Sequence, residues 1–560
     1  MLMFRFVFFL LLTGSLLLID CSGGKKNAFD IVIKGGNIVD GSGRPMFKGD
    51  IGIRGDTIVE IGDLSVKDAN TIIEAEGLTV TPGFIDIHNH SDWSFGRSQT
   101  NQNLNFLTQG VATVVVGNCG SGTFNIAETK AKWEKQGLGT NVVMLIGHGT
   151  LRESVMGTKP VAPKPEELKE MKAIVEMAMQ EGAWGISTGL EFVPGRYADT
   201  DELIELAEIV GKFNGLYCSH QRSETEDVMS AVQETIRICE EAKVRVNTSH
   251  LKVCGKSNWG LMDEIVALIE NARNKGLRFT ADMYPYDKAE SHPAFHYIEI
   301  PEDMELLLAS KKKVVAESVS RTVRNKLEKT YVEMLRNALL DVSQRARIEQ
   351  MTNFGLRHTP SPAAIWGWDS FAVVHAEKNS HLIDKIISDI AVEQNSTPFD
   401  IVADLFIEEG KDIILSEGVM SEKEMKYAMR QNWLMFSSDG NALDLNPDHV
   451  VHPRNYGSFP RVIRKYVREE TVLSLEEAIR KITHLPACVL QINNRGLLKK
   501  GYKADVTVFD FEAIQDNATF FKPHVYADGI KYLIVNGKIT IENGIYNQNL
   551  PGTVLKPERE

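Results

Sequence analysis

Eight short apolar segments between residues 83 and 439 are the feature that most constrains the fold of this chain. They read GFIDIH (83–88), ATVVVGN (112–118), VVMLIGH (142–148), WGISTG (184–189), LYCSH (216–220), VRVNTSH (244–250), LRFTADMY (277–284) and WLMFSSD (433–439). Stretches with helical periodicity lie between them, such as residues 199–213, where we expect Thr200 to be the N-cap. Such alternation is typical of parallel βα units. Eight units predict an α/β fold with a TIM-type (β/α)8 barrel at residues 81–486, whose active site lies at the C-terminal strand ends.

Both ends of the chain carry a different pattern, in which apolar and polar residues alternate and Gly or Asp mark the turns. It occurs at residues 29–80 and again at residues 487–548. Alternation with period two predicts half-buried strands. We expect one small β-sandwich domain built from both termini, and two unrelated β modules are the alternative.

One stretch is longer than a single βα connection requires. Far more than one helix separates Tyr284 from Trp433, and residues 302–350 are highly charged with helical periodicity. This predicts a helical insertion at about residues 286–365, beside or over the barrel mouth.

The N-terminus has the pattern of a targeting segment. Residues 1–21 contain Arg5, an apolar run too short to span a bilayer comfortably, and Leu18-Ile19-Asp20-Cys21, which resembles a bacterial lipobox except for Asp20. We expect a signal peptide and an exported lipoprotein, periplasmic or associated with the outer membrane, that touches the membrane only through an N-terminal lipid anchor. An uncleaved membrane anchor is the alternative. The net charge of −13 argues against a nucleic-acid partner.

Chemically capable side chains end five of the eight predicted strands. They are His88, His90, Cys119, His220, His250 and Asp439. Imidazole and thiolate ligands suit Zn²⁺, and a catalytic zinc site leaves one position for water. A carboxylate beside that water can accept its proton and pass it to a leaving amine, the role we expect for Asp439.

Several longer motifs resemble the amidohydrolase superfamily, and most closely its N-acyl-D-amino-acid deacylases (D-aminoacylases). TPGFIDIHNHSD and RGLLKKGYKADVTVFD are similar to motifs of the whole superfamily. GNCGSG, SHQRSETED, NTSHLKVCGKSNWG, SSDG and HPRNYGSFPRV are similar to the deacylases in particular. Related hydantoinases and dihydroorotases use a carboxylated lysine after strand four, and the GAWGISTGLEF segment here has no lysine.

The resemblance implies a tight zinc site formed by Cys119, His220 and His250. It also implies a second, weaker site near His88 and His90 that shares Cys119, with Asp439 as the catalytic acid and base. The implied reaction is zinc-dependent hydrolysis of the linear amide bond of N-acyl-D-amino acids, or of short peptides ending in a D-residue.

The substrate of such relatives is a small molecule with a free α-carboxylate, which calls for cationic and hydroxyl donors. The matching positions here are Lys252, Tyr284, Arg454 and Ser291. Two departures concern the pocket. Phe192 stands where relatives carry tyrosine, and Glu290 lies near the family's serine, so Glu290 is a candidate for recognising a cationic group.

Other functions remain open on the sequence. One is a cyclic-amide hydrolase or a mononuclear deaminase of the same superfamily; a deaminase would use His88, His90, His220 and Asp439 and leave Cys119 idle. Another is a lipoprotein that binds a ligand without turning it over. His148, also at a strand end, could hold substrate or be structural.

Overall fold

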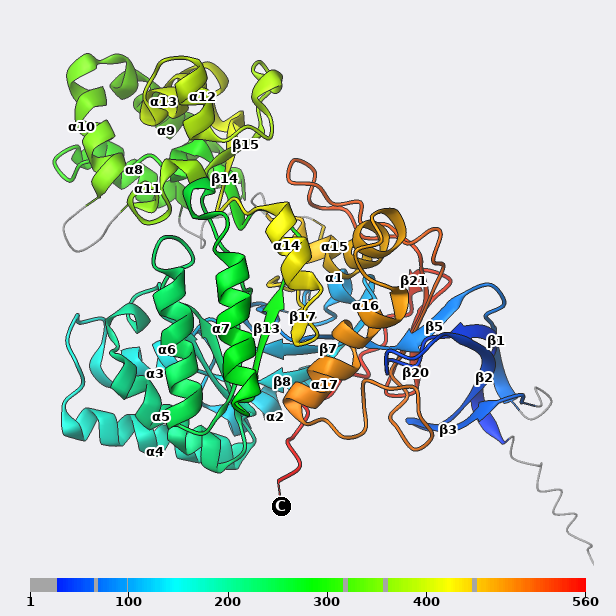
Figure 1. Cartoon of the computed structure of the whole chain (residues 1–560). Helices are drawn as coiled ribbons and strands as arrows, with labels where there is room; N and C mark the ends of the chain where they lie inside the picture. Colours follow the sequence, from blue (N-terminus) through cyan, green and yellow to red (C-terminus); the bar gives the residue numbers. More distant parts are fainter. Residues whose placement is uncertain are drawn as a thin grey trace, which may run out of the picture.

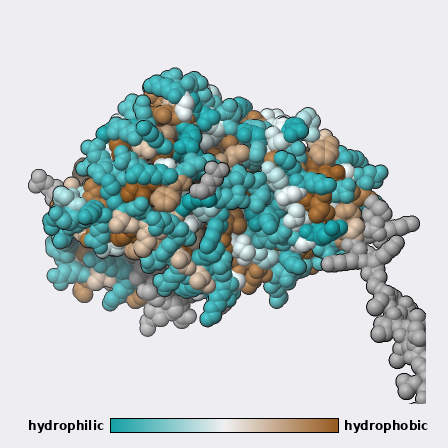
Figure 2. All heavy atoms as spheres, turned by 90° about the horizontal axis from the view of Figure 1, so that it is seen from below, coloured by the Kyte–Doolittle hydropathy of each residue, from teal (hydrophilic) through white to brown (hydrophobic). Residues whose placement is uncertain are grey.

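A computed structural model of the chain describes residues 28–559, apart from 65–68, 98, 316–320, 356–360 and 446–450 (Figure 1). The predicted signal peptide and lipobox at 1–21 lie outside these described residues. Among the helices that the structure describes, none is long and apolar enough to cross a membrane. The face shown in Figure 2 is largely hydrophilic, with scattered apolar residues.

Strands from both ends of the chain form one nine-stranded sheet. Its strands are β1 (Phe29–Ile38), β2 (Phe47–Arg54), β3 (Thr57–Gly62), β4 (Ala69–Glu74), β5 (Thr79–Pro82), β18 (Val506–Phe509), β19 (Ile530–Val535), β20 (Lys538–Glu542) and β21 (Ile545–Tyr546). The two ends join where β5 pairs with β18 in antiparallel register. Two turns meet at Gly537, where a Cβ would lie 1.9 Å from the carbonyl oxygen of Gly55, so this position requires glycine.

Parallel strands form the central part of the molecule. One sheet contains β6 (Phe84–Asp86), β7 (Val111–Val116) and β8 (Asn141–Met144). The other contains β9 (Ile146–Gly147), β10 (Gly185–Gly189), β11 (Leu216–His220), β12 (Arg245–Thr248), β13 (Phe279–Met283) and β17 (Leu434–Phe436). Only Leu145 separates β8 from β9, and a parallel bridge links Asn89 to Gly440 after β6 and β17. Each predicted strand segment contains a strand.

Helices connect these strands and bury one face against them. They are α1 (Leu104–Leu107), α2 (Ile126–Gln136), α3 (His148–Met156), α4 (Pro165–Glu181), α5 (Thr200–Lys212), α6 (Val228–Glu241), α7 (Met262–Asn274), α14 (Glu422–Met429), α15 (Arg454–Arg461), α16 (Leu475–Ile482) and α17 (His484–Leu490). The N-cap prediction for α5 was wrong by one residue: the Asp199 carboxylate accepts from the amide of Glu202 at 2.8 Å, and Thr200 is the first helical residue. A carboxylate at the N-cap also complements the positive end of the helix.

The region between β13 and β17 has a hydrophobic core of its own, from Ala294 to Leu415. Its elements are β14 (Glu290–Pro293), α8 (Glu305–Val315), α9 (Arg321–Leu340), α10 (Val342–Phe354), α11 (Pro362–Trp366), β15 (Ala372–His375), α12 (Ile387–Glu393), α13 (Pro398–Glu409) and β16 (Ile414–Glu417). In Figure 1 its helices gather at one end of the molecule. The chain enters through β14 and leaves through β16, which pair in antiparallel register. The insertion predicted at about residues 286–365 is therefore longer than expected, since its core reaches Leu415, and its described residues contain three short strands besides the helices.

Candidate metal centre and active site

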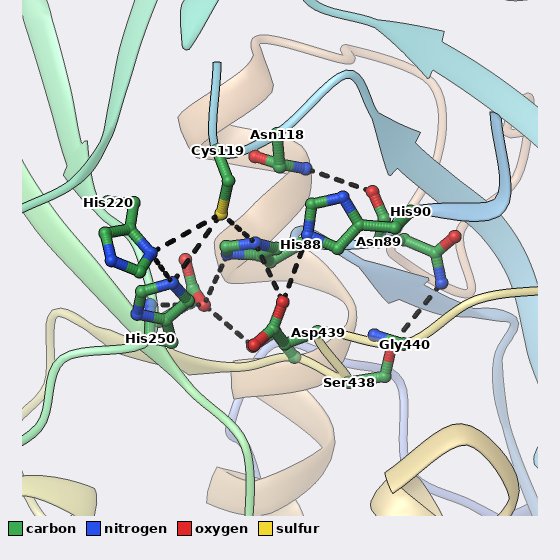
Figure 3. A network of polar contacts seen from close by, with 12 residues as sticks. His88, Asn89, His90, Asn118, Cys119, His220, His250, Ser438, Asp439 and Gly440 are labelled. Carbon is green, nitrogen blue, oxygen red and sulfur yellow. Dashed lines mark hydrogen bonds and ion pairs between the residues drawn. The ribbon is translucent and has the colours of Figure 1, made fainter. Parts of the chain in front are cut away.

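Six side chains that the sequence singled out converge at the C-terminal edge of the parallel strands (Figure 3). His88 and His90 follow β6, Cys119 follows β7, His220 ends β11, His250 follows β12 and Asp439 follows β17. The carboxyl ends of parallel strands meet at one edge, so residues far apart in sequence face one another there.

Three of these residues have a left-handed backbone that is uncommon outside glycine. The φ angles are +51° at Cys119, +34° at His250 and +49° at Asp439. Such a conformation costs on the order of 1–3 kcal/mol and persists where the surrounding structure enforces it. The buried packing at these strand ends enforces three such turns beside one another, which is typical of a functional site.

One set of ligand atoms consists of Cys119, His220 and His250, whose donors lie within 4.8 Å of one another. The Cys119 Sγ lies 3.8 Å from Nδ1 of His220 and 3.6 Å from Nε2 of His250. The two ring nitrogens are 2.9 Å apart. A thiolate and two imidazoles directed at one point are a donor set that suits zinc.

A second set consists of His88, His90, Cys119 and Asp439. Nε2 of His88 lies 3.4 Å from the Cys119 sulfur. Oδ1 of Asp439 lies 3.2 Å from Nε2 of His88 and 3.1 Å from Nε2 of His90. Cys119 therefore belongs to both sets, and its sulfur lies between them (Figure 3).

Carboxylates that the sequence analysis did not identify contact the far nitrogens of His250 and His220, and a third lies near that of His88. Glu224 lies 2.8 Å from Nδ1 of His250, Glu191 lies 3.0 Å from Nε2 of His220, and Asp282 lies 3.4 Å from Nδ1 of His88. Such partners fix the tautomer and orientation of a metal-binding imidazole. The sequence offers little to identify them. Glu224 lies in the loop after His220, Glu191 lies in the loop after β10, and Asp282 lies within β13.

Charges in the centre are strongly coupled. Burial alone would raise the pKa of the Cys119 thiol, but the neighbouring histidines outweigh it, and the pKa lies well below its usual value. Burial is likewise outweighed at Asp439, where Arg454 and His88 hold the carboxyl pKa well below its usual range. The site thus favours a thiolate and a carboxylate, the forms that bind metal or accept a proton.

A cavity of about 570 Å³ opens from this centre. Two of the predicted substrate residues, Lys252 and Arg454, line it. Lys252 Nζ lies 2.9 Å from Glu224, and Arg454 Nη1 lies 2.9 Å from Oδ2 of Asp439. Both predicted cations therefore already have an acidic neighbour in the cavity wall.

Other predicted residues lie around this cavity in different ways. Tyr284 is buried and is not among the lining residues, but its ring lies under both cations, 5.4 Å from Lys252 Nζ and 5.0 Å from the Arg454 guanidinium carbon. Ser291 is also buried and not among the lining residues. Phe192 lines the cavity and packs against the His220 ring at 4.5 Å between centroids. His148 contacts Glu202 at 2.9 Å instead, in a buried ion-pair group.

Known proteins are similar to this chain over nearly its whole length. A D-aminoacylase of Alcaligenes xylosoxydans xylosoxydans is 30% identical, over 95% of this chain and 99% of its own length. An N-acyl-D-glutamate deacylase of the same organism is 30% identical, over 91% and 93%. The solved structure of N-acyl-D-glutamate deacylase from Bordetella bronchiseptica, complexed with zinc and a phosphonate inhibitor, has a TM-score of 0.71 and 27% identity, over 94% of this chain and 100% of that one.

The comparisons confirm the resemblance drawn from the motifs. The model of the amidohydrolase family matches residues 71–282 and 365–541, which together make up more than half of the chain. The chain therefore belongs to the amidohydrolase family.

Proposed function

We propose that this protein is a zinc-dependent hydrolase that cleaves the amide bond of N-acyl-D-amino acids and releases a carboxylate and a free D-amino acid. The relatives of similar length named above are D-aminoacylase and N-acyl-D-glutamate deacylase. The observation that carries the proposal is the position of the Cys119 sulfur, which both ligand sets share. A protein that only binds a ligand would not require a proton-accepting carboxylate such as Asp439 next to the two groups of metal-binding side chains.

Cys119, His220 and His250 are the residues that would hold the principal zinc ion. Their donor types suit zinc, and carboxylates hold the far nitrogens of both histidines, as expected for metal ligands. His88 and His90, with Cys119 shared, would form a second, weaker site. A zinc ion in the principal site supplies Lewis-acid polarisation of the scissile carbonyl and a bound water of lowered pKa.

Asp439 is the residue that can move the proton of the attacking water. Its Oδ1 faces His88 and His90, and its Oδ2 is held by Arg454. This contact fixes the plane of the carboxylate, so the oxygen on the histidine side stays directed at the centre. Asp439 can then accept a proton on that oxygen and donate it to the leaving amine.

Arg454 and Lys252 are the cations available for the α-carboxylate of the substrate. Both line the cavity, and the Tyr284 ring lies beneath both. Nη1 of Arg454 is held by Asp439, whereas Nη2 has only a longer contact of 3.6 Å with Glu290, so Nη2 is the nitrogen that a substrate carboxylate would bind.

The alternatives within the family fit this site less well. A mononuclear deaminase centre would leave Cys119 without a role, although its sulfur lies within 3.8 Å of three histidine rings. A carboxylated lysine after the fourth strand is also missing, because β10 and its following loop, GISTGLEF, contain no lysine.

We infer that the parallel strands close into an eight-stranded barrel and that the terminal sheet folds into a sandwich. The chain continuity from β8 to β9 and the Asn89–Gly440 bridge support closure. A hydrophobic core shared by Ile33, Ile53, Val506 and Ile534 supports the sandwich. Export and lipidation at Cys21 stay a proposal from the sequence of residues 1–21.

The test is a hydrolysis panel of N-acetyl amino acids in both enantiomers, with the zinc content of each preparation measured. We expect activity on D-substrates that scales with zinc occupancy. Preference for L-substrates, or activity independent of metal, would contradict the proposal.

A further inference from the structure

We propose that the substrate cavity selects D-amino acids with a cationic side chain, arginine above all, which binds between the carboxylates of Glu290 and Glu417. This inference rests on the proposed function, because it assigns the substrate side chain to a place in the same cavity.

The two carboxylates lie side by side at the entrance of the inserted region. Glu290 on β14 and Glu417 on β16 are direct partners in the antiparallel pair. Directly opposite residues in such a pair project to the same face of the sheet, with Cβ atoms about 4.5–5.5 Å apart. Both residues line the cavity that also reaches Cys119, His220 and Asp439.

In the described ranges of the chain, Arg454 and His292 pair with Glu290 and leave Glu417 without a cationic partner. Lys252 is 2.9 Å from Glu224, and Arg454 is 2.9 Å from Asp439 but 3.6 Å from Glu290. His292 contacts Glu290 at 3.2 Å. No hydrogen bond or ion pair links the Glu417 carboxylate to any residue that the structure describes. A half-buried carboxylate without a partner is costly unless a cation approaches it.

The pKa of Glu417 reflects its burial and its closeness to Glu290. Burial and the charge of Glu290 raise the pKa of Glu417 to about 8. Burial, together with the charges of Glu417 and Glu290, also raises the pKa of the Tyr297 hydroxyl. Tyr297 is 3% exposed, and its hydroxyl has no hydrogen-bond partner within the described part of the chain.

An aromatic ring belongs to the wall of the same cavity as the carboxylates. Trp366 lines the same cavity, and a methyl group placed on Gly418, which follows Glu417, would lie 3.5 Å from the indole. Indole faces attract cations, and guanidinium groups stack on them. Two carboxylates with an aromatic wall match arginine best and lysine next, and they repel an anionic side chain.

The experiment compares N-acetyl-D-arginine with N-acetyl-D-citrulline, which has almost the same shape without the charge. It is run at about pH 9, above the raised pKa of Glu417, so that both carboxylates are ionised. We expect kcat/KM to be about 10-fold or more higher for arginine. Glu417→Gln should reduce the arginine value about 10-fold and change the citrulline value less than about 2-fold. Glu290→Gln should act in the same direction.

Glu302→Gln is the matched control, since Glu302 is exposed in the inserted region, away from the cavity lining. It should leave the arginine-to-citrulline ratio unchanged. Equal kcat/KM for the two substrates, or a ratio unaffected by Glu417→Gln, would overturn the inference while leaving the proposed function in place. Failure to hydrolyse any N-acyl-D-amino acid would instead refute the proposed function. Citrulline turnover by each variant shows that it has folded.

Discussion

The sulfur of Cys119 lies 3.6 Å from Nε2 of His250, although the two residues are 131 positions apart in the chain. The same sulfur is 3.4 Å from Nε2 of His88 on the other side. A thiolate between two groups of imidazoles would be a ligand for zinc in either group. Cys119 follows β7 with a left-handed backbone, so the surrounding structure holds this residue in place.

Replacing Cys119 with alanine should remove the shared ligand. We expect zinc content of the purified protein to fall at least about 10-fold, together with kcat/KM, because the remaining imidazoles bind zinc without thiolate charge. Metal analysis and kinetics on one preparation test this. Cys488→Ala is the control, since Cys488 is exposed and outside the centre. Full activity of the Cys119 variant would exclude the proposed centre.

Asp439→Asn should separate proton transfer from metal binding. The amide keeps the shape of the side chain but cannot accept the proton, so we expect kcat to fall by about 10²–10⁴-fold. Zinc content should stay close to that of the unmodified protein, because Cys119, His220 and His250 are unchanged. A strongly reduced kcat together with unchanged zinc content would support the role of Asp439, and an unchanged kcat would refute it. Steady-state kinetics and metal analysis of the same preparation measure both.

Glu224→Gln tests the carboxylates behind the histidines. Glu224 contacts both Nδ1 of His250 and Nζ of Lys252, so its loss should free both side chains. Removal of such a metal-ligand partner costs about 10–100-fold in metal affinity or activity. Zinc affinity is measured by competition with a chelator. Glu226→Gln changes an exposed carboxylate in the same loop and should retain the original affinity.

The raised pKa of Glu417 predicts a dependence of stability on pH. The folded protein holds this proton up to about pH 8, whereas the unfolded chain releases it near pH 4.5, the ordinary pKa of a glutamate side chain. Between these values the folded state binds more protons than the unfolded chain. The contribution of Glu417 to stability is therefore fully present below about pH 4.5 and is lost as the pH rises through 8.

Glu417→Gln removes this titration, because glutamine stays neutral. We expect the melting temperature of the variant to exceed that of the unmodified protein by about 2 °C at pH 9, with no such gain at about pH 4. Thermal unfolding at both pH values measures the difference. An equal shift at both would show that the change acts through packing and not through charge.

Strand-end positions were the part of the active site that the sequence could predict. His88, His90, Cys119, His220, His250 and Asp439 stand at or just after apolar runs, and parallel strands bring such positions to one edge. The sequence did not identify Glu191 and Glu224 as partners of the histidines, because glutamates are common in loops. Only the folded chain shows which of them contact an imidazole. The N-cap of α5 was misplaced by one residue, since Asp199 and Thr200 are both good caps.

The sequence by itself determined the periodicity of the strands and helices, the membership in the amidohydrolase family and the set of metal-binding side chains, because each is written in local residue patterns. The tertiary structure alone decided which nitrogen faces the thiolate, which carboxylate holds each ring, and that Glu290 and Glu417 meet across two strands. These relationships join residues that are far apart in the chain, through strand register and side-chain rotation, which no local pattern encodes.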